Sequence, residues 1–365
     1  MPAVYISYPF CRQKCTYCNF ASGVFPRSLE ERYRKALLAE IGSHIWRWRP
    51  ETLYLGGGTP GDIEAEGLEA ILAAVPGHPW LEVTIEAAPG SIARDLVDVW
   101  CRLGVNRVSL GVQSFIGGEI ARTGRKHTAH TVRDEVALLR NGGITNINID
   151  LIAGLAGQTV KNWSESLDWI ERLAPPHVSV YMFELDEDSR LGREILQGGA
   201  RYGARDVPSD DRTAEMYETA VERLLAMGLE RYEISNFALP GHESRHNLKY
   251  WRLEPYTGFG ADAHSFDGDM RRQNVEAPQD YTERVERGES PCIGAVRAQA
   301  EEERFFVGLR LTAGIRPRPK EWQRFERPIR RFLGEGLLET DGETLRLTSR
   351  GILVSNEVFQ EFVDI

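Results

Sequence analysis

The chain has 365 residues, of which 42% are hydrophobic and 27% are charged, and its formal net charge is −10 at pH 7. This near-average composition excludes whole-chain disorder, a collagen-like repeat and a coiled coil, and the acidic balance argues against a nucleic-acid partner, which needs a basic surface. No apolar run reaches the roughly 18 residues of a membrane span, and the N-terminus has no secretory-signal pattern, so we expect a cytoplasmic protein of one large or two unequal domains.

Six short β-rich runs alternate with amphipathic helical patterns through the first half of the chain. This alternation predicts βαβ units and a parallel sheet, closed as a barrel or open as a wound sheet, with functional residues at the carboxyl ends of the strands. Strands buried on both faces should be continuously apolar, and several of these runs are. At the first helix, Ser28 and Glu31 match a capping box. The predicted strands lie near residues 3, 52, 83, 107, 146 and 178, and the predicted helices cover about 28–45, 62–75, 91–103, 129–141 and 160–173.

The pattern changes after about residue 186. Residues 186–210 are polar and contain several glycines, which predicts an exposed excursion or lid. A helix at about 211–227 and a strand at 231–236 follow. From about residue 299, a helix, a linker with two prolines, a second helix, a hairpin and a final helix predict a small winged-helix-like module.

Three of the five cysteines, Cys11, Cys15 and Cys18, form a C-x3-C-x2-C group directly after the first predicted strand. An odd number of cysteines without a secretory signal makes a poor disulfide framework. Three thiolates are too few for a closed site of four cysteines, whereas a 4Fe-4S cluster held by three leaves one iron open to chelate a small molecule. The plainer alternatives are three buried loop cysteines or an incomplete zinc knuckle. Cys101 lies on a predicted helix as a small hydrophobe, and Cys292 receives no role.

The cysteine group resembles that of the radical S-adenosylmethionine superfamily. In that family the open iron binds the methionine part of S-adenosylmethionine, and the reduced cluster cleaves the sulfonium to give a 5′-deoxyadenosyl radical. The resemblance implies an α/β fold, namely a partial (β/α)6 TIM-like barrel of the radical SAM type with a small C-terminal winged-helix-like α+β domain. It also implies that the 4Fe-4S cluster is held by Cys11, Cys15 and Cys18, and that S-adenosylmethionine is bound by Tyr5, Gly57, Gly58, Thr59, Glu86, Gln113, Arg125 and Asp150.

The roles of these residues follow from a resemblance to the coproporphyrinogen-oxidase-like branch of the superfamily. There the glycine segment, here 56–58, contacts the methionyl amino group, and glycine allows that close approach of the backbone. Arg125 pairs with a carboxylate, for which its planar fork is suited. Asp150 accepts from ribose hydroxyls or from an ammonium group. Taken alone, each polar residue is more simply interpreted as a helix cap or a surface ion pair.

Residues 246–251 are HNLKYW and match the H-N-x-x-Y-W motif of HemW-type heme chaperones, and 258–265 is similar to the G-x-G-x-x-A-H-S segment that follows it there. The resemblance spans about residues 3–365 and implies that His246 holds heme, since a neutral imidazole is a suitable axial iron ligand. Oxygen-independent coproporphyrinogen III oxidases, in the same branch, carry a fourth cysteine where this chain has Phe20.

The same resemblance predicts three parts of the chain. These are a radical SAM partial barrel with the cluster and S-adenosylmethionine site at 1–235, a connecting segment with the heme motif at 236–298, and a HemN C-terminal-type domain at 299–365. The chain departs from the family pattern at Ser7, where a histidine is usual, and at Ala88, where asparagine is commoner. Neither departure affects a predicted cluster ligand.

The leading hypothesis is a heme chaperone that binds a 4Fe-4S cluster, S-adenosylmethionine and heme, and transfers heme to an acceptor apoprotein, with an electron donor for the cluster. Whether the protein is an enzyme stays open, because the alternative is an oxygen-independent coproporphyrinogen III oxidase that decarboxylates two propionates to vinyl groups. A third hypothesis is a radical enzyme on RNA that binds through the winged module, which the net charge of −10 disfavours. A homodimer and a heme acceptor peripheral to a membrane are left open.

Overall fold

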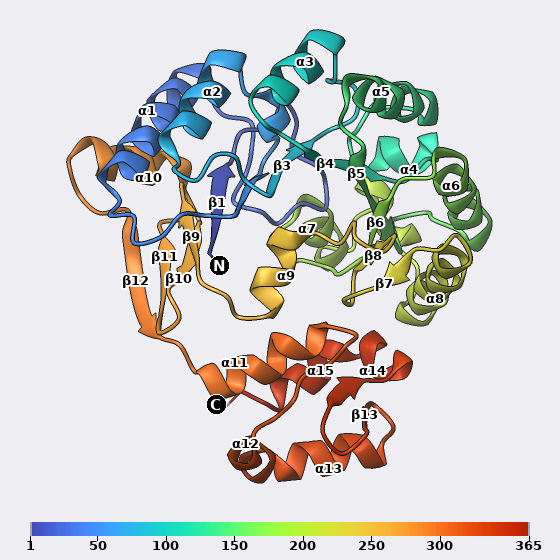
Figure 1. Cartoon of the computed structure of the whole chain (residues 1–365). Helices are drawn as coiled ribbons and strands as arrows, with labels where there is room; N and C mark the ends of the chain where they lie inside the picture. The colour runs from blue at the N-terminus through green and yellow to red at the C-terminus, as the bar shows by residue number, and fades with distance from the viewer. Residues whose placement is uncertain (1, 364–365) are drawn as a thin grey trace.

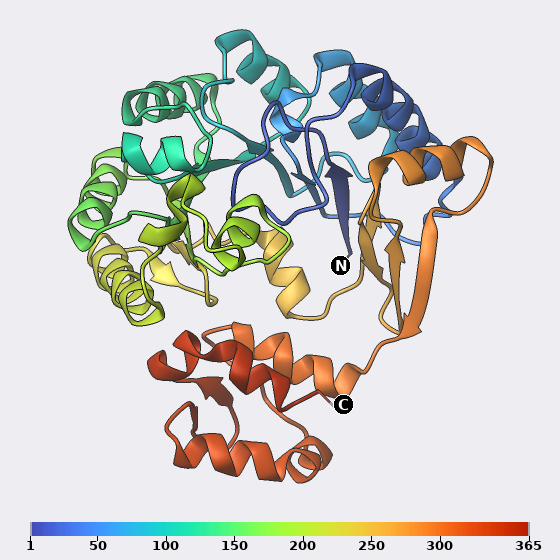
Figure 2. The same ribbon diagram turned by 180° about the vertical axis from the view of Figure 1, so that it is seen from behind.

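The computed structural model describes residues 2–363 as a twelve-stranded sheet surrounded by helices, with a smaller C-terminal unit beside it (Figure 1, Figure 2). Six parallel strands in chain order form the centre of the sheet, and the helices between them cover its outer face. This confirms the predicted α/β fold, with all six strands and the helices between them. The strands are β1 (Ala3–Tyr8), β2 (Thr52–Gly57), β3 (Glu82–Ala87), β4 (Arg107–Gln113), β5 (Asn146–Ala153) and β6 (His177–Met182), and the helices are α1 (Arg27–Ser43), α2 (Ala65–Ala74), α3 (Arg94–Arg102), α4 (Gly117–Arg122), α5 (Ala129–Gly142) and α6 (Val160–Leu173).

The central strands have one apolar and one polar face, so the prediction of continuously apolar strands is wrong. Side chains on the helix side are valine, leucine and isoleucine, and they are fully buried, as at Leu53, Val108 and Ile149. The alternate side chains face the inside of the partial barrel, where the strand register places them side by side. They form a polar chamber in place of the branched aliphatic layers usual in TIM barrels. They include Thr52, Tyr54, Glu82, Thr84, Glu86, Arg107, Ser109, Asn148, Asp150, His177 and Ser179.

Helix α1 begins before the predicted capping box. Its N-cap is Pro26, whose carbonyl accepts the N–H groups of Leu29 at 2.9 Å and Glu30 at 3.2 Å. No side chain caps this end, and Ser28 is exposed within the first turn. The predicted Ser28 cap is wrong because Pro26, with its fixed φ, sets the first helical residue at Arg27.

The second half of the chain extends both ends of the central sheet. Strand β8 runs antiparallel beside β6, with β7 at its outer edge, and four further strands follow on the other side of β1. Strand β9 pairs parallel with β1, so the N-terminal strand lies between β2 and β9. The predicted connecting segment 236–298 therefore contributes strands to the same sheet, and its boundaries as a domain stay a prediction. The added elements are α8 (Asp210–Ala226), β7 (Glu230–Arg231), β8 (Asn236–Ala238), α9 (Arg245–Trp251), β9 (Tyr256–Phe259), β10 (His264–Phe266), β11 (Met270–Asn274), α10 (Pro278–Glu286) and β12 (Cys292–Arg297).

The strand predicted at 231–236 is divided into β7 and β8 because Glu233 leaves the sheet. Its backbone bridges to Leu311, and its fully buried carboxylate accepts a hydrogen bond from Arg310 at 3.3 Å. Leu311 and Arg310 belong to the C-terminal unit, so this interruption joins the sheet to that unit.

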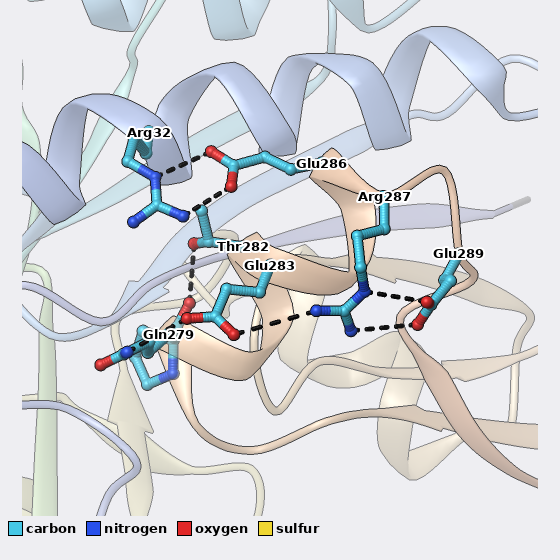
Figure 3. Close-up of polar contacts among 8 residues, drawn as sticks. Arg32, Gln279, Thr282, Glu283, Glu286, Arg287 and Glu289 are labelled. Atoms are coloured by element: carbon cyan, nitrogen blue, oxygen red, sulfur yellow. Dashed lines mark hydrogen bonds and ion pairs between the residues drawn. The ribbon is translucent and has the colours of Figure 1, made fainter.

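Helix α10 packs along α1 on the outer side of the sheet (Figure 3). Arg32 of α1 makes a bidentate pair with Glu286, with N–O distances of 2.8 and 2.5 Å, and Arg287 pairs in the same way with Glu289. All four side chains are about half exposed, so solvent screens these pairs and they add little to stability.

The buried anchor of the same contact is Glu40 of α1. Its carboxylate accepts hydrogen bonds from the Tyr281 hydroxyl at 2.6 Å, the Asn274 side-chain amide at 2.7 Å and the Gly260 N–H at 2.8 Å. Burial raises the pKa of Glu40, and these three donors oppose that shift. Through this one carboxylate, α1 fixes α10 and the turn after β9, and with them the added strands beside β1.

The C-terminal unit consists of short helices around a two-stranded hairpin, as predicted. Its core is a group of phenylalanine rings with centroids 4.4–6.4 Å apart, Phe305, Phe325, Phe332 and Phe362. The second predicted helix is two helices that meet at buried Phe325. No helix in the described part of the chain is long and apolar enough to cross a membrane. The elements are α11 (Ala300–Phe306), α12 (Pro319–Arg324), α13 (Glu326–Gly334), β13 (Leu338–Thr340), β14 (Leu345–Leu347), α14 (Ser349–Leu353) and α15 (Ser355–Gln360).

The apolar face of the sheet gives a stability prediction. Ile149 is 0% exposed, and replacing it with alanine removes buried methyl groups and leaves a cavity, at a cost of about 2–5 kcal/mol. The Ile149→Ala variant should therefore unfold at a clearly lower urea concentration than the wild type. Leu225→Ala, at a site 61% exposed, is the control and should change the free energy of unfolding by less than about 0.5 kcal/mol. Equal midpoints for both variants would contradict the assignment of Ile149 to the core.

Candidate functional site

The cysteine loop, residues 9–25, lies at the carboxyl ends of β1 and β2. The Cys11 N–H donates to the Gly23 carbonyl at 2.8 Å, which closes the loop on itself. The Thr59 N–H, just after β2, donates to the Phe10 carbonyl at 2.9 Å. The loop is therefore fixed at the end of the barrel where sites of this architecture form.

Residues 186–206 pack against the cysteine loop. The Leu191 N–H donates to the Thr16 carbonyl at 2.8 Å, and the Asn19 side-chain amide donates to the Asp186 carboxylate at 3.1 Å. The predicted excursion is thus attached to the cysteine loop, and its role as a lid stays a prediction. Its elements are helix α7 (Arg190–Leu196) and the 3-10 turn η2 (Arg201–Asp206).

Arg125 lies between the cysteine loop and β4. Its Nε donates to Cys15 Sγ at 3.1 Å, and its Nη1 donates to the Gly111 carbonyl at 2.5 Å. Burial alone would lower the pKa of Arg125, but Tyr17 and Cys15 beside it raise that pKa, so the guanidinium stays charged. A fixed cation beside Cys15 suits a residue that binds metal as a thiolate.

The role of the three loop cysteines as cluster ligands stays a prediction. All are free, and burial raises the pKa of Cys11, while hydrogen bonds with Thr59 and Ser22 oppose that shift. Within residues 2–363, no group of three or more His, Cys, Asp and Glu side chains converges as one metal ion requires.

The glycine run at the end of β2 places bare backbone beside the cysteine loop. A side chain at Gly58 would come within 2.6 Å of the Phe10 carbonyl, so only glycine fits there. Gly57 has a φ of +102°, which favours glycine, and its N–H donates to Glu86 Oε2 at 3.2 Å. These glycines therefore let the end of β2 pack directly against β1 and the cysteine loop.

Glu86, near the end of β3, joins several of the predicted site residues. Its Oε1 accepts from the Tyr54 hydroxyl at 2.8 Å, and the Tyr54 ring stacks on Tyr5 with centroids 6.1 Å apart. Burial raises the pKa of Glu86 to about 7, with the Tyr54 hydrogen bond opposing and Asp150 adding to the shift. Glu86 thus titrates near neutrality, as groups in functional sites often do.

Gln113 and Asp150 complete this end of the chamber on β4 and β5. Gln113 has a φ of +69°, rare for a residue with a side chain, and its buried Oε1 has no hydrogen-bond partner in the described chain. Asp150 accepts from Ser109 at 3.1 Å and Asn148 at 2.7 Å, and burial raises its pKa. A buried acceptor without a donor fits a ligand that supplies one. All eight residues predicted for S-adenosylmethionine thus gather on or after β1–β5, and their contacts with it stay a prediction.

His246 does not belong to this group, because it lies at the amino end of the barrel. Its Nδ1 bonds the Thr52 hydroxyl at 2.9 Å and its Nε2 bonds the Tyr250 hydroxyl at 2.8 Å. The side chain is 0% exposed, and burial lowers its pKa to about 3. Thr52 is the first residue of β2 and Gly57 the last, so His246 lies at the opposite end of this strand from the glycine run. Its ring is nevertheless 5.2 Å from the ring of Tyr54, whose hydroxyl bonds Glu86.

A set of buried polar contacts at the amino end of the barrel was not predicted from the sequence. His177 bonds Asn148 through Nδ1 at 2.7 Å and Tyr232 through Nε2 at 2.9 Å. Arg107 is 1% exposed, and its Nε has no hydrogen-bond partner in the described chain. Polar residues at every second strand position, as in N-I-N-I-D at 146–150, carry the signal that indicates a polar inner face.

Two family models match the chain, that of the radical SAM superfamily over residues 5–170 and that of the HemN C-terminal domain over residues 297–354. Heme chaperone HemW of Lactococcus lactis is 34% identical, with 99% of this chain and 97% of the relative covered, and HemW of Bacillus subtilis is 32% identical, with 100% and 99% covered. A mouse protein named radical S-adenosyl methionine domain-containing protein 1, mitochondrial, is 30% identical, with 96% and 85% covered.

Among solved structures, coproporphyrinogen III oxidase (HemN) from Escherichia coli matches with a TM-score of 0.83, covering 99% of this chain and 90% of that chain at 21% identity. This likeness establishes the fold. The fold and the three-cysteine loop define the class as radical S-adenosylmethionine proteins. Within that class, identity of 32–34% over nearly the whole length shows that the chain belongs to the HemW family.

The raised pKa of Glu86 predicts a pH-dependent stability. Between its ordinary value of 4.5 and about 7, the folded chain holds a proton at Glu86 that the unfolded chain has lost, so stability falls as pH rises through this window. Glu86→Gln cannot titrate, so this fall in stability with rising pH is absent from the variant. Urea unfolding from pH 5 to pH 8 should therefore show the variant gaining stability relative to the wild type as pH rises. Glu66→Gln, the same change at the surface, is the control, and parallel curves for Glu86→Gln and the wild type would contradict the shift.

Proposed function

We propose that this protein is a heme chaperone that binds a 4Fe-4S cluster, S-adenosylmethionine and heme, and passes heme to an acceptor apoprotein. Full-length similarity to proteins named heme chaperone HemW supports this function. The HNLKYW motif on α9 and Phe20, where the oxidases carry a cysteine, support it as well. The similarity to HemN extends to the fold and carries no argument for its reaction.

The observation that carries the proposal is the separation of the two sites. The cysteine loop lies at the carboxyl ends of the strands, and His246 lies at their amino ends, beside Thr52, the first residue of β2. Iron held by His246 would therefore lie at the opposite end of the strands from the cysteine loop. A heme motif apart from the cysteine loop suits carriage of heme.

In this proposal Cys11, Cys15 and Cys18 hold the cluster, which supplies an electron and an open iron. Arg125 provides a positive charge beside Cys15, and its remaining donors suit a carboxylate. The glycine run, which the family resemblance assigns to the methionyl amino group, lies directly beside the cysteine loop. Near neutral pH Glu86 can be neutral or charged, and Asp150 presents acceptors for hydroxyl or ammonium groups.

A paired assay tests the function. Anaerobically reconstituted protein is mixed with hemin, and then with apomyoglobin as a general heme acceptor, while absorbance follows binding and transfer. The same preparation is reduced and incubated with S-adenosylmethionine and coproporphyrinogen III, and products are separated by chromatography. We expect hemin binding and transfer without decarboxylated porphyrinogen. Protoporphyrinogen formed over many turnovers would instead identify an oxidase.

The cluster assignment has a separate test. Cys15→Ser removes one of three thiolate ligands, so the broad iron–sulfur absorbance after anaerobic reconstitution should be lost. Cys101→Ser is the matched control, because Cys101 lies on α3, where its thiol donates to the Gly142 carbonyl at 3.1 Å. That variant should keep the full absorbance. A complete cluster in Cys15→Ser would contradict the three-cysteine site.

A further inference from the structure

His246, which the proposed function assigns to heme iron, is closed off in this structure. Its side chain has no exposed surface, and its Nε2 is occupied by the Tyr250 hydroxyl. Iron and that hydroxyl cannot use the same nitrogen, and a porphyrin cannot reach a fully buried ring. Heme binding through His246 therefore requires α9 to move away from the sheet.

The sheet holds the beginning of α9 through Glu82, the first residue of β3. The Glu82 carboxylate accepts the N–H groups of Arg245 at 2.9 Å and His246 at 3.0 Å, and the Ser244 hydroxyl at 3.3 Å. These amides are among the donors that a helix leaves unsatisfied at its N-terminus. Glu82 thereby fixes the position from which His246 meets Thr52.

The C-terminal unit holds the end of α9 through Arg310, in the turn η3 (Gly308–Arg310). The Arg310 guanidinium lies 4.4 Å from the centroid of the Trp251 ring and 3.3 Å from the buried Glu233 carboxylate. The Arg310 carbonyl accepts the Ile234 N–H at 3.1 Å. One residue thus joins α9, the interruption between β7 and β8, and the C-terminal unit, and α9 lies between sheet and unit in both views (Figure 1, Figure 2).

The backbone enters the left-handed region on both sides of α9. Gly241 precedes the helix with a φ of +86°, and Leu253 follows it with a φ of +54°. A leucine in the left-handed region is strained, so the seated position of α9 is kept by contacts elsewhere. The helix has only seven residues, and Glu82 and Arg310 hold its two ends. Between them, the buried Lys249 ammonium pairs with Glu51 at 3.0 Å and with Glu254 at 3.1 Å.

We propose that Arg310 is a positioning residue for heme binding: its contacts with Trp251 and Glu233 keep α9 seated, and their release makes His246 available to heme iron. This inference rests on the proposed function, in which the chain binds heme through His246. The apparent affinity of a site that is available only part of the time is reduced by that fraction. Weakening the Arg310 contacts therefore tightens heme binding, whereas loss of an ordinary structural contact does not.

The test uses the full chain with the paired substitution Arg310→Gln/Glu233→Gln. The pair removes both charges together, so no unpaired carboxylate stays buried, and the amide at 233 keeps an acceptor for the Ser235 N–H. Arg330→Gln/Glu326→Gln is the matched control, because those side chains form an exposed ion pair at 2.6 Å within the same unit. Hemin titration followed by Soret absorbance measures affinity, and hydrogen exchange of residues 245–251 measures the release of α9.

The expected result is faster exchange at 245–251 and hemin binding tightened about threefold or more in the first pair, with the control unchanged. Adding His246→Ala to the first pair should abolish the gain in hemin affinity and the Soret absorbance of the bound heme. Unchanged exchange and affinity in a folded variant would overturn the proposal, as would a gain that survives His246→Ala. Absence of hemin binding in every variant would overturn the proposed function itself, and exchange at 245–251 would still report whether Arg310 holds α9.

Discussion

Buried carboxylates inside the partial barrel are the constraint on which the rest of this structure depends. A carboxylate taken out of water is costly unless hydrogen bonds replace the solvent. Glu82 obtains its donors from α9, Glu86 from Tyr54 and the backbone of β2, and Asp150 from β4 and β5. Arg107 is the buried cation that acts on Glu86 and Asp150. The hydrogen bonds that offset the cost of burying these carboxylates also hold α9 at the amino end of the barrel and the glycine run at the end of β2.

Strand β2 connects the two ends of the molecule. At its amino end, the Thr52 hydroxyl bonds His246. The Tyr54 ring lies 5.2 Å from the His246 ring, and the Tyr54 hydroxyl bonds one oxygen of Glu86. At the carboxyl end, the Gly57 N–H donates to the other oxygen of Glu86. Tyr54 therefore contacts both His246 and Glu86, so a single side chain joins the heme motif to the predicted S-adenosylmethionine residues.

Local patterns predicted the parts of this structure that local chemistry decides. The six central strands follow from β-branched runs between amphipathic helices, and the cysteine loop follows from the spacing of Cys11, Cys15 and Cys18. The capping box failed because Pro26 starts the helix first. The burial of His246 and the pairing of β9 with β1 were beyond local patterns, because both depend on partners about 200 residues away or more. The interruption at Glu233 likewise depends on Arg310, which lies in another unit.

The pairing of β1 between β2 and β9 has a consequence for synthesis of the chain. The second edge of β1 can be covered only after residues 256–259 have been synthesised, roughly 13–50 s after the first residue at usual elongation rates. During that interval the strand that leads into the cysteine loop has an open edge, the kind of surface that pairs with other chains. Iron–sulfur assembly on the nascent loop would therefore take place on an unfinished sheet, whereas assembly after release takes place on a strand bonded along both sides.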